Sequence, residues 1–176
     1  MNLSRLFHHI PVIFLLLAFI QLRAQQDFFS WIINGEVAKV ESYIESIPEA
    51  TNQLSKEGFS PLILASYTGS LELVRLLVTK GAAVNYNSSM GTALMAAIVK
   101  NHVTVVQFLL EKGADVNIWD ERGTTPLIYA VQFKNKEVIK LLLNHKPDTS
   151  HTDKNGKTAF EYAVFSGDRD VIELLK

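Results

Sequence analysis

The side chains best suited to chemistry come closest together in one short stretch near the end of the sequence. His145 and His151 alternate there with Asp148 and Asp153, and imidazole and carboxylate groups at such spacing can bind a metal ion or transfer protons. The chain lacks the G-x-S-x-G, G-x-x-x-x-G-K and H-E-x-x-H motifs and the paired glycines of a dinucleotide site. It also has no cysteine, which excludes thiolate catalysis and disulfides. We therefore expect no cofactor, and keep a metal-dependent enzyme only as an alternative.

The composition fits one folded domain of ordinary size, with 176 residues that are 48% hydrophobic. The formal net charge is −1 at pH 7, so the chain has no basic surplus that would attract nucleic acid or an anionic membrane. Lys134, Lys136 and Lys140 come nearest to a basic cluster, but Glu137 lies among them, which favours an ordinary solvated helix face. We expect no nucleic-acid partner.

A motif that occurs four times predicts the helices that must position these groups. Its copies begin at positions 32, 33 and 33 residues apart, at Ser60, Thr92, Thr125 and Thr158. Each first residue carries a hydroxyl that can cap a helix N-terminus, and Pro61 and Pro126 occupy the first helical position after two of them. Gly58, Gly123 and Gly156 lie two residues before a cap, where a tight turn would need positive φ. This period predicts stacked repeat units.

A second apolar pattern follows each cap at a fixed distance of fourteen residues. It starts at Val74, Val106, Ile139 and Ile172 and has the i, i+3, i+4 spacing of a helix with one buried face. We predict that a second helix begins at each of these residues. Gly81 and Gly113 would end two of these helices with a left-handed C-cap, whereas Lys146-Pro147 would end the third in a different way.

The sequence from Gly113 to Ala130 closely resembles the repeat of the ankyrin family. It contains Gly113-Ala114-Asp115-Val116-Asn117, then Asp120, then Gly123-Thr124-Thr125-Pro126-Leu127, and the resemblance extends over about residues 55–176. It implies an all-α solenoid of antiparallel helix pairs joined by turns or short hairpins. The histidine that the family has after Pro-Leu is absent, whereas His102 falls at a family histidine position after the turn between the helices, which implies a structural role.

The resemblance also implies a glycine in the turn between the two helices of each unit. Gly69 and Gly167 fit this pattern, but Asn101 and Lys134 occupy the other two positions. Asparagine tolerates the left-handed region and lysine does not. We therefore expect either that Asn135 takes up the turn or that the backbone is strained at Lys134.

A concave surface built from the first helices and the turn tips is the binding face that the resemblance implies. Several aromatic residues map onto this surface, and aromatic side chains are frequent anchors of protein interfaces. We predict Tyr67, Tyr129, Phe133, Tyr162 and Phe165 on or near the groove, and Tyr86 and Trp119 at turn tips. Some of these side chains would instead pack between neighbouring helices.

Residues 1–24 have the pattern of a secretory signal peptide. Arg5 precedes an apolar run from Ile10 to Ile20, and small Ala24 follows polar Gln21 and Arg23. The run is shorter than the roughly 20 residues that span a bilayer, so cleavage near Ala24 is favoured over an uncleaved anchor. We expect an exported protein, periplasmic in a Gram-negative bacterium or secreted, that has no membrane contact once the leader is removed.

The remaining chain, residues 25–176, is predicted to be one repeat domain. A degenerate N-terminal cap unit covers 27–54, and full units cover about 55–87, 88–119, 120–152 and 153–176. Irregularity is expected in a terminal unit because it has a neighbour on only one side. Phe28, Phe29 and Trp31 of the cap unit are predicted either to cover the first full unit or to dock a partner.

Together these features favour a non-enzymatic module that binds a protein partner. A narrower alternative is an inhibitor or immunity protein for a toxin or hydrolase of the cell envelope. A third is a mainly structural protein whose ends stack on other copies, so we expect a monomer or a weak homo-oligomer.

Overall fold

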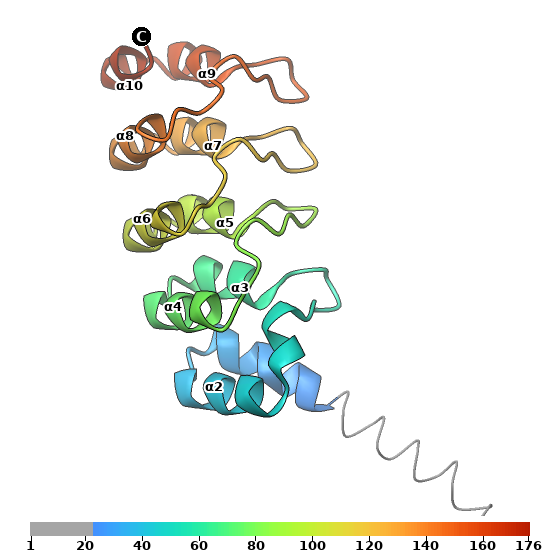
Figure 1. Cartoon of the computed structure of the whole chain (residues 1–176). Coiled ribbons are helices and arrows are strands. Elements are labelled where there is room, and N and C mark those ends of the chain that lie inside the picture. Colours follow the sequence, from blue (N-terminus) through green and yellow to red (C-terminus); the bar gives the residue numbers. More distant parts are fainter. Residues whose placement is uncertain (1–22) are drawn as a thin grey trace, which may run out of the picture.

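The computed structural model of the chain describes residues 23–176, and this part consists of helix pairs stacked in sequence order (Figure 1). Within it the only β-type pairing is an isolated bridge between Ser88 and Gly91, so the prediction of an all-α repeat fold is confirmed. No helix of residues 23–176 is long and apolar enough to cross a bilayer. The predicted leader lies almost entirely in residues 1–22, outside the described residues.

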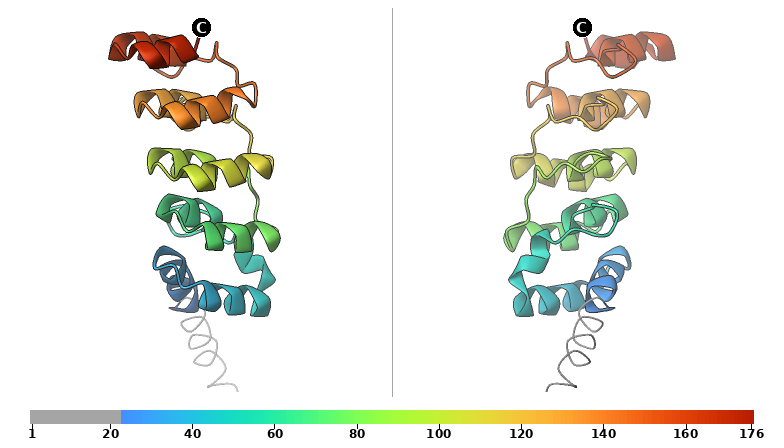
Figure 2. Two further views of the ribbon diagram at one scale, coloured as in Figure 1. Left: turned by 90° about the vertical axis from the view of Figure 1, so that its left-hand side faces the viewer. Right: turned by 90° about the vertical axis from the view of Figure 1, so that its right-hand side faces the viewer.

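Four helix pairs follow one another along the stack. They are α3 (Pro61–Thr68) with α4 (Leu71–Thr79), α5 (Ala93–Val99) with α6 (Val103–Glu111), α7 (Pro126–Gln132) with α8 (Lys136–Leu143), and α9 (Ala159–Ser166) with α10 (Arg169–Leu174). A helix over residues 23–33 and α2 (Val37–Ser46) precede them, and the 3-10 helix η1 (Pro48–Asn52) makes the connection. The first helices form one layer, the second helices another, and the loops before α3, α5, α7 and α9 project from the first layer (Figures 1 and 2).

The four predicted caps start the first helix of each pair. The hydroxyls of Ser60, Thr92, Thr125 and Thr158 each accept a hydrogen bond from the backbone N–H three residues later. Pro61 and Pro126 occupy the first turn, as predicted. In α9 the Glu161 carboxylate also accepts from the Thr158 N–H at 2.7 Å, which completes a capping box.

The second helices begin one turn earlier than predicted. Val74, Val106, Ile139 and Ile172 are each the fourth residue of their helix, not the first. The N-caps are Ser70, His102, Asn135 and Asp168, and three of them accept a backbone hydrogen bond through the side chain, His102 being the exception. The apolar stripe misplaced the start because the first turn of each helix contributes few buried residues.

Two lysines adopt the left-handed conformation that the sequence pattern assigns to glycine. Lys134 has φ 54° in the turn between α7 and α8, where Asn135 is the helix cap, so the expected strain falls on Lys134. Lys146 has φ 53° after α8, at the position that Gly81 and Gly113 occupy in the preceding pairs. All three ends thus use a left-handed residue. They still differ in one bond, because Ala82 and Ala114 donate to the carbonyls of Leu77 and Leu109, whereas Pro147 has no N–H to donate.

Neighbouring pairs share one continuous apolar core. The small residues Ala65, Ala97, Ala130 and Ala163 are fully buried, which lets adjacent helices approach closely. In the N-terminal unit Phe28 is fully buried and stacks on Tyr43 at a ring distance of 4.8 Å, while Phe29 and Trp31 pack partly against the same core. These three aromatics therefore serve the packing of the cap unit.

Candidate functional site on the inner face and turn tips

The predicted binding face corresponds to the side of α3, α5, α7 and α9 that faces away from the second helices, together with the loops that precede these four helices. We call this surface the inner face, and the loops at 53–59, 86–91, 118–124 and 151–157 the tips. The four helices lie one above another along the stack (Figure 1). Large exposed aromatics lie seven or eight residues after three of the N-caps, at Tyr67, Phe133 and Phe165, and Phe160 near the start of α9 is also exposed.

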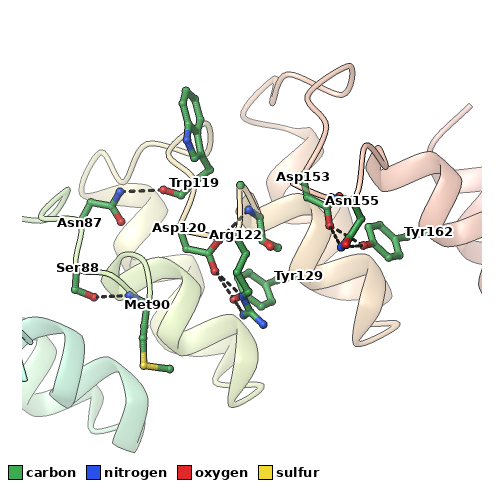
Figure 3. A network of polar contacts seen from close by, with 12 residues as sticks. Asn87, Ser88, Met90, Trp119, Asp120, Arg122, Tyr129, Asp153, Asn155 and Tyr162 are labelled. Carbon is green, nitrogen blue, oxygen red and sulfur yellow. Dashed lines mark hydrogen bonds and ion pairs between the residues drawn. The ribbon is translucent and has the colours of Figure 1, made fainter.

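The third tip is built around the buried carboxylate of Asp120 (Figure 3). Its Oδ1 accepts hydrogen bonds from the backbone N–H groups of Arg122 and Thr124, both at 2.9 Å. Its Oδ2 accepts from the Tyr129 hydroxyl at 2.7 Å. The Arg122 guanidinium lies at 3.4 Å from Oδ2 and also contacts the Tyr129 hydroxyl. The tip is thereby fixed to the helix that it precedes.

The fourth tip repeats this arrangement, with Asp153 in the place of Asp120. The Asp153 carboxylate accepts from the backbone N–H groups of Asn155 and Lys157, and from the Tyr162 hydroxyl at 2.6 Å (Figure 3). The first two tips use serine instead. Ser55 and Ser88 bond their own loops through the hydroxyl, and the tyrosine position of α3 and α5 holds Leu64 or Ala96.

These contacts determine the ionisation of the tip residues. Burial alone would raise the pKa of the Asp120 carboxyl, but the hydrogen bonds from Tyr129, Thr124 and Arg122 outweigh it and hold the pKa below its ordinary value of 3.8. The pKa of Asp153 is lowered in the same way, against burial, by Tyr162, Lys157 and Asn155. Burial and the bond to Asp120 raise the pKa of the Tyr129 hydroxyl to about 12. The carboxylates are therefore charged, and the tyrosine neutral, at neutral pH.

Trp119 is the aromatic side chain that the tips present to solvent. Its indole is 53% exposed, points away from the Asp120 network (Figure 3) and stacks on the His151 ring at 4.9 Å. Its backbone carbonyl accepts a 2.9 Å bond from the Asn87 side chain. His151 in turn lies with Nε2 2.8 Å from the Gly123 carbonyl oxygen. Trp119 is thus exposed but held by its neighbours on both sides.

Cationic side chains lie over the exposed aromatic rings of the inner helices. The Lys100 ammonium is 4.6 Å from the centre of the Tyr67 ring, and the Lys157 ammonium is 4.9 Å from the Phe165 ring. Phe133 instead stacks on Tyr129, with ring centres 6.3 Å apart. A cation over a ring face is attracted to it by the ring quadrupole.

A cleft of about 490 Å³ opens beside Phe133, between the turns of the α5–α6 and α7–α8 pairs. Its apolar wall consists of Ile98, Val99, Val103 and Phe133, and Asn101, Lys134, Asn135, Lys136 and Glu137 complete the lining. The cleft is open and lined by both apolar and polar side chains.

The structure divides the seven predicted site residues into two groups. Tyr67, Trp119, Phe133 and Phe165 are about half exposed or more. Tyr86, Tyr129 and Tyr162 use their hydroxyls within the fold, the Tyr86 hydroxyl donating to the Gly58 carbonyl at 3.0 Å. Their role in binding stays a prediction. The Asp–Tyr pairs were not predicted, although the nine-residue spacing of both pairs is visible in the sequence.

Three of the four side chains in the stretch from His145 to Asp153 that could do chemistry, His151, Asp148 and Asp153, make other contacts. His151 and Asp153 belong to the tips, and the Asp148 carboxylate accepts from the Ser150 backbone and hydroxyl. Among residues 23–176 no three metal-ligating side chains lie close enough to hold one ion. His102 packs over Gly69 with Nε2 3.1 Å from the Tyr67 carbonyl oxygen, which fits the structural role implied for it.

The chain is similar to known proteins of one family. A family model described as "Ankyrin repeats (3 copies)" matches residues 25–120 and 117–176. A putative ankyrin repeat protein of Fowlpox virus (strain NVSL) is 43% identical over 84 residues, which are 47% of this chain and 45% of the relative. Ankyrin repeat and SAM domain-containing protein 6 of Rattus norvegicus is 35% identical over 105 residues, 58% of this chain and 12% of the relative. SH3 and multiple ankyrin repeat domains protein 1 of Homo sapiens is 32% identical over 106 residues, 59% of this chain and 5% of the relative. The matched segments span less than half the length of these relatives.

Proposed function

Because the chain belongs to the ankyrin repeat family, whose repeats are protein–protein interaction modules, we propose that it is a non-enzymatic protein that holds a protein partner on its inner face and tips. The observation that carries this proposal is the combination of exposed aromatic side chains with a rigid frame. Trp119 and Phe133 are each about half exposed, and both are fixed by stacking. Anchors that are ordered before binding lose little entropy when the partner docks.

Trp119 and Phe133 are the principal anchors of this interface. Trp119 offers an indole face at a tip, and Phe133 borders the apolar wall of the cleft beside α7. Interface energy is concentrated in a few buried aromatic side chains. Tyr67 and Phe165, each with a lysine over its ring, extend the contact toward the two ends of the face.

The polar groups of the tips form hydrogen bonds within the fold, which supports binding rather than catalysis. Asp120 and Asp153 are occupied by backbone and tyrosine hydrogen bonds, and the nearby imidazole of His151 contacts a carbonyl oxygen. A general base must reach the proton that it removes, and these groups are committed to the tips instead.

Export to the periplasm or the exterior is a further part of the proposal. It is supported by Arg5, the apolar run from Ile10 to Ile20 and the small Ala24. Cleavage after Ala24 would leave the core intact, since Phe28 is the first fully buried residue of the described part. Intact-mass analysis of the protein isolated from its native cell tests this. A chain that starts at Gln25 supports export with cleavage, and a chain that retains the leader contradicts it.

Site-specific photo-crosslinking in the native cell tests the face. A photoreactive amino acid is placed in the full chain at Trp119 or Phe133, and in matched controls at Gln107 or Lys140, exposed residues of α6 and α8. We expect the inner-face positions to yield one discrete protein adduct that the outer-helix positions do not yield. Adducts from the outer helices alone would overturn the proposed face.

A further inference from the structure

The C-terminal ends of α3, α5, α7 and α9 form a band across the inner face that carries lysines and aromatics but no carboxylate. The band comprises residues 67–69, 99–101, 132–134 and 165–167, which follow the N-caps of the four helices by seven to nine positions. It contains the exposed aromatics Tyr67, Phe133 and Phe165 and the exposed lysines Lys100 and Lys134, and no aspartate or glutamate. The ammonium group of Lys157, from the fourth tip, also reaches the band at the Phe165 ring.

The positive charge of these three lysines is not matched by an ion pair within residues 23–176. Lys100 and Lys157 lie over aromatic ring faces instead. The pKa values of Asp168 and Glu161 are lowered mainly by backbone hydrogen bonds at the starts of their own helices, and Lys134 and Lys157 add only a smaller attraction from beyond ion-pair distance. The charge of the band therefore remains available to a binding partner.

Lys134 occupies its place in the band at a cost in backbone energy. Its φ is 54°, in the left-handed region, where the equivalent residues of the other units are Gly69, Asn101 and Gly167. Non-glycine residues in this region are concentrated at binding and catalytic sites, and no ion pair of Lys134 within the described residues offsets the strain. Lys134 and Phe133 line the same open cleft, so charge and apolar surface adjoin there.

We propose that the band binds an acidic, extended segment of the partner protein, whose carboxylates meet Lys100, Lys134 and Lys157. This inference rests on the proposed function and specifies the chemistry of the partner. The three lysines belong to three successive units, and packed helices lie about 8–10 Å apart. In the polyproline II conformation, residues three apart point the same way and are separated by about 9 Å. A segment with an acidic residue at every third position therefore matches the spacing of the lysines.

The attraction is a local property of this face, because the whole chain has a formal net charge of −1. Surfaces that interleave cations with aromatic rings also bind single-stranded nucleic acid. However, Glu57, Glu121 and Glu161 are exposed on the tips and on α9, and they would repel a strand that is charged at every nucleotide. A protein segment with spaced carboxylates can meet the lysines and avoid these glutamates.

Fluorescence anisotropy with two labelled peptides tests the charge of the partner. The probe is (Glu-Leu-Pro)4, and its matched control is (Gln-Leu-Pro)4, which has the same length and shape without the charge. We expect the full chain to bind the acidic peptide about ten-fold more tightly, as three exposed ion pairs would give, and the difference should shrink at high salt. Equal binding of the two peptides, no binding of the acidic peptide, or tighter binding of single-stranded DNA of twelve nucleotides would overturn the inference.

Lysine variants locate the site of the acidic peptide. Lys100→Gln and Lys134→Gln should each weaken its binding about two- to five-fold. Lys112→Gln and Lys140→Gln are the matched controls, since they remove the same charge from exposed positions at the end of α6 and in α8, and they should leave the Kd nearly unchanged. Equal losses in both sets would assign the effect to overall charge and overturn the inference.

Failure of this inference can be told apart from failure of the proposed function. If the two peptides bind equally while crosslinks from Trp119 and Phe133 still capture a partner, only the acidic chemistry is wrong. If the crosslinks come from the outer helices alone, the proposed face itself is wrong, whatever the peptides show.

Discussion

The Tyr129 hydroxyl donates a 2.7 Å hydrogen bond to the buried carboxylate of Asp120, and Tyr162 makes the same bond to Asp153 in the next unit. Each pair joins a tip to the helix that follows it. The tips in turn contact one another, because the Lys154 N–H donates to the Arg122 carbonyl at 2.9 Å. The inner face therefore presents its exposed aromatics from a frame that is fixed by hydrogen bonds on the described tips.

Replacing Tyr129 by phenylalanine should destabilise the fold. The change removes one donor from a buried charged acceptor, and such bonds contribute about 1.5–3 kcal/mol. We expect the free energy of unfolding, measured by urea denaturation, to fall by about 1–2 kcal/mol, since the backbone donors remain. Tyr67→Phe is the control, because the Tyr67 hydroxyl makes no hydrogen bond within residues 23–176. An equal loss in both variants would show that the Asp–Tyr bond contributes nothing.

Acid should destabilise the protein because it protonates the two buried carboxylates of the tips. Asp120 and Asp153 have pKa values below 3.8 in the folded state, so the unfolded chain binds protons more readily. Their stabilising effect is complete above the unfolded pKa and is lost as the pH falls through the lowered folded pKa. The urea midpoint should therefore fall steeply below about pH 4. Asp120→Asn should lower the midpoint at pH 7 and make its acid dependence shallower, and an unchanged acid slope would contradict this account.

Lys134→Gly should stabilise the protein. A left-handed non-glycine residue costs about 1–2 kcal/mol, and glycine removes this strain. Only part of that energy is gained, because glycine also makes the unfolded chain more flexible. We expect a net gain of about 0.5–1 kcal/mol in thermal or urea unfolding. Lys100 has a negative φ of −93° and carries no left-handed strain, so Lys100→Gly should give no gain. A destabilising effect of Lys134→Gly would mean that the Lys134 side chain stabilises the fold by more than its backbone strain destabilises it.

Gly69→Ala should be far more damaging than the same change at another left-handed glycine. A Cβ at Gly69 would lie 2.4 Å from Cε1 of His102, whereas one at Gly35 meets nothing within 4 Å. Both changes incur the cost of a left-handed alanine, about 1–2 kcal/mol, and only Gly69→Ala also displaces the imidazole and its contact with the Tyr67 carbonyl. Differential scanning calorimetry should give a clearly lower Tm for Gly69→Ala than for Gly35→Ala. Equal values would mean that His102 moves aside without cost.

The local signals in the sequence were sufficient to predict the N-caps of the first helices and most turns. Thr125 and Pro126 form a start signal that depends on neighbouring backbone groups only, and the structure has the helix start there. The starts of the second helices were misplaced because the cap at Ser70 precedes the apolar stripe by a turn. The left-handed conformation of Lys146 was not predicted, because Pro147 is a strong stop signal by itself, whereas the backbone at Lys146 follows the glycines of the preceding pairs.

The division of the aromatics could not be predicted from composition and spacing alone. Tyr129 and Phe133 are one helical turn apart, and both were assigned to the groove. The buried Asp120 accepts from the Tyr129 hydroxyl and draws that ring into the tip, while Phe133 has no polar group to satisfy and stays half exposed. Which aromatic is free for a partner thus depends on a hydrogen bond across nine residues.

Isothermal titration of the partner identified by crosslinking tests the central claim most directly. If the inner face holds the partner, Trp119→Ala and Phe133→Ala should each weaken binding by about 30-fold, which corresponds to about 2 kcal/mol. Gln107→Ala and Lys140→Ala on the outer helices should leave the Kd unchanged. Unchanged affinity in both inner-face variants, with the fold intact by circular dichroism, would contradict the account.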